Sequence, residues 1–208
     1  MLNIENLSFR YPNQKELLFE NLSFHCPSAE LFYLIGENGS GKTTLLRILG
    51  GLAQAHSGQI HVKGHPLSEN QISLLQTQNE CSFPNLTGRE TLRLFFQLNQ
   101  REYREDLLWM QILNKSDSFQ QALITRYGEC STGMRQLINI AIALTKDAHF
   151  YLFDEPFVSL DEKNRDRVTE ILEALSQDHL VWVTDHKIQD SMKTYSKILL
   201  TGKGIQNA

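Results

Sequence analysis

Eight consecutive residues combine closely spaced glycines with a lysine and a hydroxyl side chain: Gly36-Glu37-Asn38-Gly39-Ser40-Gly41-Lys42-Thr43. The glycines let the backbone turn so that successive N–H groups point inward and form a cradle for anionic oxygens. Lys42 would reach the terminal phosphates as a point charge, and the hydroxyl of Thr43 would coordinate Mg2+. The pattern predicts a binding site for a nucleoside triphosphate and its magnesium ion.

The segments on either side of this loop distinguish a phosphate site from a glycine-rich turn that carries a lysine by coincidence. Residues 31–35 are apolar and predict a buried strand, and the leucines and isoleucine of 45–49 recur at helical spacing. A phosphate loop needs a strand before it and a helix after it, because the positive end of the helix dipole then faces the anion. We therefore expect nucleotide binding here.

Polar residues follow two further apolar segments that predict strands. Asp154 and Glu155 come after the segment 149–153, and His186 comes after the segment 180–184. Functional loops of a mostly parallel sheet lie at the carboxyl ends of its strands, so we expect all three residues near the phosphate loop. Asp154 would hold Mg2+ directly or through water, and Glu155 would orient an attacking water. The alternative for such acids is simple capping of the next loop.

Tyr11 ends an alternating segment, Leu7, Phe9 and Tyr11, which predicts a half-buried strand that stops at the turn 12–13. Its ring could lie against a flat base, because stacking needs only a free face. It could equally be an ordinary aromatic of an edge strand. The sequence leaves both interpretations open.

The remaining segments predict strands that alternate with helices. Strands are expected near 18–24, 59–64 and 72–75, helical segments within 79–130, and longer helices at 131–146, capped by Ser131, and 162–176. This order favours an α/β fold with a mostly parallel core sheet and an N-terminal antiparallel β subdomain. We expect a single domain, with 1–77 and 139–208 as the core and 78–138 as an inserted α-helical subdomain.

Composition excludes several classes of protein. The net charge of −4 and the pI near 6.0 provide no basic field for nucleic acid or anionic lipid. No apolar run approaches the roughly 20 residues of a membrane-spanning helix, so no direct membrane insertion is expected. Asn3 and Glu5 interrupt any signal peptide, which favours the cytosol. The three cysteines are widely spaced, so we expect reduced thiols and no structural metal.

These landmarks, in this order, resemble those of an ABC-family ATPase domain over essentially the full length of the chain. Gly36 to Thr44 resembles the Walker A loop, including its second threonine, and residues 151–155 resemble the Walker B strand with its catalytic glutamate, Glu155. Tyr11 resembles the adenine-stacking aromatic. The resemblance implies a P-loop NTPase of the ABC type that uses ATP and Mg2+.

Further residues take their roles from the same resemblance. Gln78, followed six positions later by Pro84, resembles the Q-loop glutamine that senses Mg2+ and the partner, and Gln76 is the competing choice. Asp161 belongs to a segment that resembles the D-loop. His186 resembles the switch histidine near the γ-phosphate.

The signature motif departs from the family pattern. Where the family has Leu-Ser-Gly-Gly-Gln, this chain has Cys130-Ser131-Thr132-Gly133-Met134. Ser131 and Gly133 are kept, and these are the positions whose hydroxyl and amide would meet a γ-phosphate. The loss of the glutamine and of one glycine weakens that contact, so the resemblance implies an active but slow site.

The resemblance also implies partners. The signature residues would complete the site of a second ATPase subunit, the same chain or another, with two ATP molecules held head to tail. An integral-membrane transporter subunit would dock near Gln78 to Leu86, on the cytoplasmic face of the inner membrane. The signature form favours export, with a faint resemblance to haem-exporter ATPases of cytochrome c maturation. A soluble ABC ATPase that acts as a mechanical switch is the alternative, which the acidic balance and the lack of a coiled-coil insertion disfavour.

Overall fold

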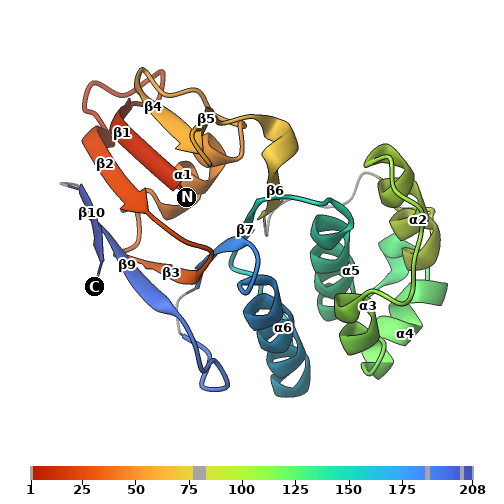
Figure 1. Ribbon diagram of the computed structural model, residues 1–208. Helices are drawn as coiled ribbons and strands as arrows, with labels where there is room; N and C mark the ends of the chain where they lie inside the picture. The colour runs from red at the N-terminus through yellow and green to blue at the C-terminus, as the bar shows by residue number, and fades with distance from the viewer. Residues whose placement is uncertain (1, 77–82, 186–187, 202–203, 208) are drawn as a thin grey trace.

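The computed structural model describes residues 2–76, 83–185, 188–201 and 204–207. Two sheets organise the chain: a four-stranded sheet with the order β2-β1-β4-β5 and a six-stranded sheet with the order β10-β9-β3-β8-β7-β6. In Figure 1 the four-stranded sheet lies at one end of the molecule and the helices α2 to α4 lie at the other. The architecture is the α/β fold that the sequence predicts.

The four-stranded sheet is antiparallel and forms the N-terminal β subdomain. Its strands are β1 (Leu2–Phe9), β2 (Phe19–Cys26), β4 (Ser57–Val62) and β5 (His65–Pro66). Strand β2 is buried at alternate residues over most of its length, as expected for a strand with one face on the core. The predicted strand through Tyr11 is wrong at its end, because β1 stops at Phe9 and the chain then turns, with the N–H of Gln14 donating to the carbonyl oxygen of Tyr11 at 3.0 Å.

The six-stranded sheet is parallel except for its edge strand β10. Its strands are β3 (Leu31–Ile35), β6 (Ile72–Gln76), β7 (Phe150–Asp154), β8 (Leu180–Thr184), β9 (Ser196–Thr201) and β10 (Gly204–Asn207). Strands β9 and β10 extend the predicted sheet. All residues of β7 and β8 are buried, because both faces of the sheet are covered.

Side-chain alternation divides the core into two layers on the two faces of this sheet. On one face Phe150 and Trp182 pack with α1 (Lys42–Leu49) and the β subdomain. On the other face Phe153 and Val183 pack with α5 (Thr132–Thr145) and α6 (Glu162–Leu175). The sheet is therefore held from both sides, and the carboxyl ends of its strands are fixed relative to α1 and α5.

The helical insert between β6 and α5 contains α2 (Gly88–Leu98), α3 (Leu108–Leu113) and α4 (Asp117–Ile124). Short 3-10 turns, Glu69–Gln71 and Tyr127–Glu129, precede β6 and α5. Helix α5 runs without interruption through residue 138, so the proposed boundary of the helical subdomain there stays a prediction. Within the described ranges, none of the helices combines the length and apolar character that crossing a bilayer requires.

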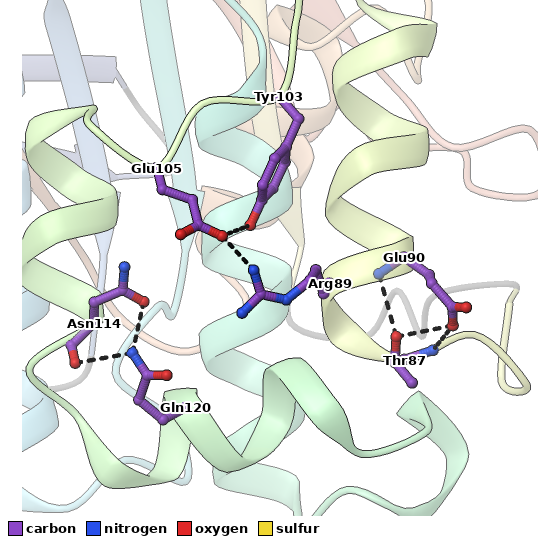
Figure 2. Close-up of polar contacts among 7 residues, drawn as sticks. All are labelled: Thr87, Arg89, Glu90, Tyr103, Glu105, Asn114 and Gln120. Carbon is purple, nitrogen blue, oxygen red and sulfur yellow. Dashed lines mark hydrogen bonds and ion pairs between the residues drawn. The ribbon is translucent and has the colours of Figure 1, made fainter.

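Polar contacts fix the start of the insert. Thr87 and Glu90 form the capping box that their spacing predicts, since the N–H of Thr87 donates to Glu90 Oε2 at 2.8 Å and the N–H of Glu90 donates to Thr87 Oγ1 at 3.3 Å (Figure 2). Arg89 pairs with Glu105, which also accepts a hydrogen bond from Tyr103 at 2.8 Å. The connection between α2 and α3 is therefore tied back to α2.

Candidate nucleotide site

The phosphate loop joins β3 to α1 in a conformation that only glycine can adopt at its key positions. Gly41 has a φ of 97°, and a Cβ there would lie 2.6 Å from the ring of Phe19. A Cβ at Gly36 would lie 2.5 Å from the carbonyl oxygen of Leu200 on β9. Larger residues would therefore push the loop away from β9 and from the β subdomain.

Helix α1 begins with its backbone N–H groups open to an anion. Its N-cap is Gly41, no side chain caps its first turn, and that turn contains no acidic residue. The hydroxyl of Ser40 is buried and has no hydrogen-bond partner among the described residues. Uncapped helix amides and an unsatisfied buried hydroxyl are the chemistry that a phosphate group satisfies, so the loop fits the predicted triphosphate.

The side chain of Lys42 lies against the backbone of the phosphate loop. Its Nζ donates to the carbonyl oxygens of Gly36 at 2.8 Å and Glu37 at 3.1 Å. These contacts hold the ammonium group against the loop backbone, where its charge adds to the positive end of α1. Lys42 is therefore positioned to contact an anion seated in the loop.

Thr43 and Asp154 lie close together although they are 111 residues apart in the sequence. Thr43 Oγ1 donates to Asp154 Oδ1 at 3.3 Å, and Asp154 is 6% exposed. A carboxylate and a hydroxyl at the edge of a phosphate site are oxygen ligands that Mg2+ prefers. The donor set therefore fits a magnesium ion bound together with phosphates.

Thr184, which was not predicted as a site residue, supports this acid from the neighbouring strand. Strands β7 and β8 are adjacent and pair Asp154 with Thr184. Thr184 Oγ1 donates to Asp154 Oδ1 at 2.5 Å and accepts the N–H of Glu155 at 3.0 Å. A polar residue at the end of an otherwise apolar strand is the signal that could have identified it.

Glu155 adopts a left-handed backbone conformation with a φ of 51°, which is uncommon for a residue other than glycine. Its N–H donates to both the carbonyl and the hydroxyl oxygen of Thr184, each at 3.0 Å. The turn carries the residue from the end of β7 into the cleft beside the phosphate loop. The structure thus brings the acid predicted to orient water next to Lys42 and Thr43.

Part of the phosphate loop, the start of α1 and Glu155 line a cleft of about 470 Å3. Its lining includes half of the residues predicted for the site and two that were not predicted, Gln14 and Leu18. The residues that line it are Tyr11, Gln14, Leu18, Asn38, Gly39, Gly41, Lys42, Thr43, Thr44 and Glu155. The cleft therefore extends from the phosphate loop to the segment between β1 and β2.

Tyr11 occupies the β-subdomain wall of this cleft. Its hydroxyl shares a hydrogen bond with Thr44 Oγ1 at 2.6 Å, and Phe9 packs edge to face against its ring at 5.1 Å between centroids. The side chain is 38% exposed and lies beyond the end of β1, so it is not an edge-strand residue. Stacking on adenine stays a prediction that this position suits.

The described residues of the segments that resemble the signature and the D-loop do not line the cleft, and neither do Gly36, Ser40 and Asp154. Ser131 caps α5 by accepting the N–H of Met134 at 3.2 Å, with Gly133 in the same turn. Asp161 caps α6 by accepting the N–H of Asn164 at 2.8 Å. Gln78 and His186 lie outside the described residues. One chain therefore brings together the described residues predicted for phosphate and Mg2+, and the signature residues lie outside the cleft.

Cys130 directly precedes Ser131, and the surroundings of its thiol make it unreactive. Cys130 is 4% exposed, and this burial raises the pKa of its thiol. The thiol therefore stays protonated at neutral pH and packs as a small apolar side chain.

Comparison with known proteins agrees with this geometry. The sequence profile of the family described as "ABC transporter" matches residues 19–158. The taurine import ATP-binding protein TauB of Mesorhizobium japonicum is 28% identical over 98% of this chain and 80% of its own length. The ATP-dependent lipid A-core flippase of Pectobacterium atrosepticum is 27% identical over 98% of this chain and 37% of its own length.

A solved structure shares the fold along the whole chain. The dimeric ATP-binding cassette in a post-hydrolysis state with ADP and phosphate superposes with a TM-score of 0.82. The two proteins are 20% identical, and the match covers 100% of this chain and 98% of that one. This likeness shows that the two chains share one fold.

Proposed function

This chain belongs to the ABC transporter family, and from that premise we propose that it binds and hydrolyses ATP to power transport through a separate membrane protein. The observation that carries the proposal is the contact between Thr43 and Asp154 beside the phosphate loop. The contact joins the hydroxyl of Thr43 on α1 to the carboxylate of Asp154 at the end of β7. A nucleotide-bound Mg2+ would need both oxygen ligands at this position. The ion would offset phosphate charge when bound.

The residues of the cleft divide the chemistry between them. The amides at the start of α1 and the ammonium of Lys42 would hold the phosphates, exchanging the present contacts of Lys42 with loop carbonyls for phosphate oxygens. Glu155 would accept a proton from the attacking water, and its turn is fixed by Thr184. Gln78 and His186 keep their roles as expectations from the sequence. Catalysis in this proposal is positioning together with charge stabilisation.

A second ATPase subunit completes the proposed site. Ser131 and Gly133 lie outside the cleft that contains Lys42, so they are available to the nucleotide of another subunit. We propose that two copies of this chain enclose two ATP molecules head to tail. A dimeric cassette of the same fold supports this arrangement. Closure and opening of the pair would transmit the energy of hydrolysis.

The proposed membrane partner docks on the start of the helical insert. Phe83 is 39% exposed and packs edge to face against Phe95, with Pro84 and Leu86 beside it in sequence. An apolar patch of this kind suits a short helix of a partner. The chain would then sit on the cytoplasmic face of the inner membrane. Import and flippase relatives both match the chain, and we propose export on the form of the signature, Ser131 to Met134.

The closed dimer is tested by Glu155→Gln. The amide keeps the shape of the side chain but cannot accept a proton, so ATP should bind without being hydrolysed and trap the dimer. Size-exclusion chromatography with saturating MgATP should show a dimer for Glu155→Gln and a monomer for Glu155→Gln combined with Lys42→Ala. A Glu155→Gln variant that stays monomeric contradicts the paired-site mechanism.

The membrane partner is tested by affinity purification of the tagged chain from detergent-solubilised membranes of its host. A multi-spanning membrane protein should co-purify and be identified by mass spectrometry. Its identity would also establish the direction of transport. Absence of the chain from the membrane fraction, with soluble proteins alone recovered, would favour the soluble switch.

A further inference from the structure

One buried hydrogen bond joins the signature helix to the loop that carries the catalytic acid. Gln136 lies on α5 and is 5% exposed, and its Nε2 donates to the carbonyl oxygen of Pro156 at 2.9 Å. Pro156 directly follows Glu155, and Gln136 lies five residues after Ser131, in the second turn of α5. A buried amide that donates to a backbone carbonyl fixes the position of that backbone.

The same loop meets α5 at a second point. A Cβ at Gly133 would lie 2.8 Å from the carbonyl oxygen of Ser159, so the loop approaches the first turn of the helix closely. Phe157 and Leu160 are 1% and 6% exposed and belong to the core layer that contains α5. The loop 155–160 therefore lies on the first two turns of α5.

The backbone of this loop needs such support. Glu155 and Ser159 both have positive φ, 51° and 64°, although neither is glycine. Conformations of this kind persist where the surrounding structure holds them, and they concentrate at functional sites. Contacts with α5 provide that restraint at both ends of the loop.

We propose that Gln136 is a positioning residue that couples the two ATP sites of the dimer. The inference rests on the proposed paired-site function, in which Glu155 acts on the nucleotide of its own chain and Ser131 meets the nucleotide of the partner. A displacement of α5 when Ser131 meets a phosphate is then passed through Gln136 to Pro156 and changes the position of Glu155. Occupancy of one site thus affects hydrolysis at the other.

The variant Gln136→Met tests the link, because methionine has a similar length and no N–H to donate. Ser73→Ala is the matched control: Ser73 Oγ donates to the carbonyl oxygen of Ala143 at 2.6 Å, another buried bond to α5, far along the helix from the signature. Both variants should lower the thermal midpoint by similar amounts. ATP hydrolysis by Gln136→Met should lose cooperativity, with the Hill coefficient falling from about 2 to about 1.

Two further readouts separate positioning from simple destabilisation. The turnover number of Gln136→Met should fall about tenfold while MgADP affinity, measured by calorimetry on the monomer, stays within about twofold. Gln136→Glu should regain cooperativity at a pH low enough to protonate its buried carboxyl, which can then donate, and should lose it as the pH rises.

The outcomes are distinct. A Hill coefficient that is unchanged in Gln136→Met, or equally reduced in Ser73→Ala, would overturn the link while leaving the paired-site mechanism intact. A wild-type chain that hydrolyses ATP as a monomer with a Hill coefficient of about 1 would overturn the paired-site mechanism and the link together.

Discussion

The N-termini of α1 and α5 differ in how their backbone N–H groups are satisfied. Helix α1 begins at Gly41 without a side-chain cap, so its first amides are open to a phosphate in the cleft of the same chain. Helix α5 begins at Ser131, whose Oγ accepts the N–H of Met134 at 3.2 Å. The hydroxyl of Ser131 still has its hydrogen to donate outward. The N-terminus of α1 is therefore suited to bind an anion with its own amides, whereas the capped N-terminus of α5 could add only one further contact.

Lys42→Ala should have the largest effect, because it removes the charge beside the uncapped end of α1. We expect the rate of ATP hydrolysis to fall at least about 100- to 1,000-fold, the range typical of losing one charge-stabilising donor. The thermal midpoint should change little, since the lysine contacts only two loop carbonyls. Steady-state kinetics and thermal unfolding measure both quantities.

The matched control for this variant is Lys63→Ala. Lys63 is an exposed lysine whose Nζ contacts His149 Nδ1 at 3.3 Å, away from the cleft. Its removal should leave hydrolysis unchanged. Equal losses in the two variants would show that general charge, and not the position of Lys42 at α1, supports the activity.

Ser131→Ala should have an intermediate effect and should separate the two helix ends. It removes the cap of α5, which costs about 1 kcal/mol of stability, and it removes the hydroxyl offered to a partner nucleotide. MgADP binding to the monomer should stay unchanged because the cleft does not contain Ser131. Hydrolysis by the dimer should fall about tenfold, as expected when one hydrogen bond to the reacting phosphate is lost.

Ser116→Ala is the control for the capping part of this effect. Ser116 caps α4 in the same way, accepting the N–H of Phe119 at 3.2 Å. It should lower the stability of the chain by a similar amount, about 1 kcal/mol, without changing the hydrolysis rate. If both serine variants slow hydrolysis alike, the role of Ser131 is structural and the comparison of the two helix ends fails.

The sequence alone predicts the phosphate loop at the start of α1, but it does not predict the tertiary contacts that support the site. The loop 36–43 is contiguous, so residue types and spacing alone predict its phosphate-binding chemistry. The position of Asp154 at the end of a strand follows from the apolar run before it. The contact of Thr184 with Asp154 depends on β8 lying beside β7, which no local pattern specifies. The hydrogen bond of Tyr11 with Thr44 likewise joins segments that only the folded chain brings together.

The fold shows the same division. Segments with strong apolar periodicity, such as α5 and α6, begin and end within one residue of their predicted ends. Strand β9 is only partly buried and pairs in parallel with β3, which lies far earlier in the chain, so its place in the sheet depends on a long-range contact. The loop 155–160 also depends on tertiary contacts, because the positive φ values of Glu155 and Ser159 are not favoured by these residue types, and Thr184 and α5 contact the loop at these points.

The N-terminus of α2 is a third case, and a substitution there should have the smallest effect of those considered. Helix α2 is closed by its own capping box, in which the carboxylate of Glu90 accepts hydrogen bonds from the backbone N–H and the hydroxyl of Thr87, both at 2.8 Å (Figure 2). These bonds lower the pKa of Glu90. The folded carboxyl therefore loses its proton more readily than the unfolded one, and the resulting stabilisation is present above the ordinary glutamate pKa of about 4.3 and is lost as the pH falls through the folded value.

Glu90→Gln should accordingly lower the thermal midpoint slightly at pH 7 and leave it unchanged at pH values below the folded pKa of Glu90. The expected shift is small because the pair is exposed and the amide of glutamine can still accept from Thr87. A double-mutant cycle with Thr87→Ala, measured across this pH range, isolates the bond from the loss of the charge itself. ATP hydrolysis should be unaffected in all three variants, since no residue of α2 lines the cleft. A loss of ATP hydrolysis in Glu90→Gln with the same pH dependence would show that a capped helix N-terminus contributes to the ATP site. Capping would then not be what distinguishes α5 from α1.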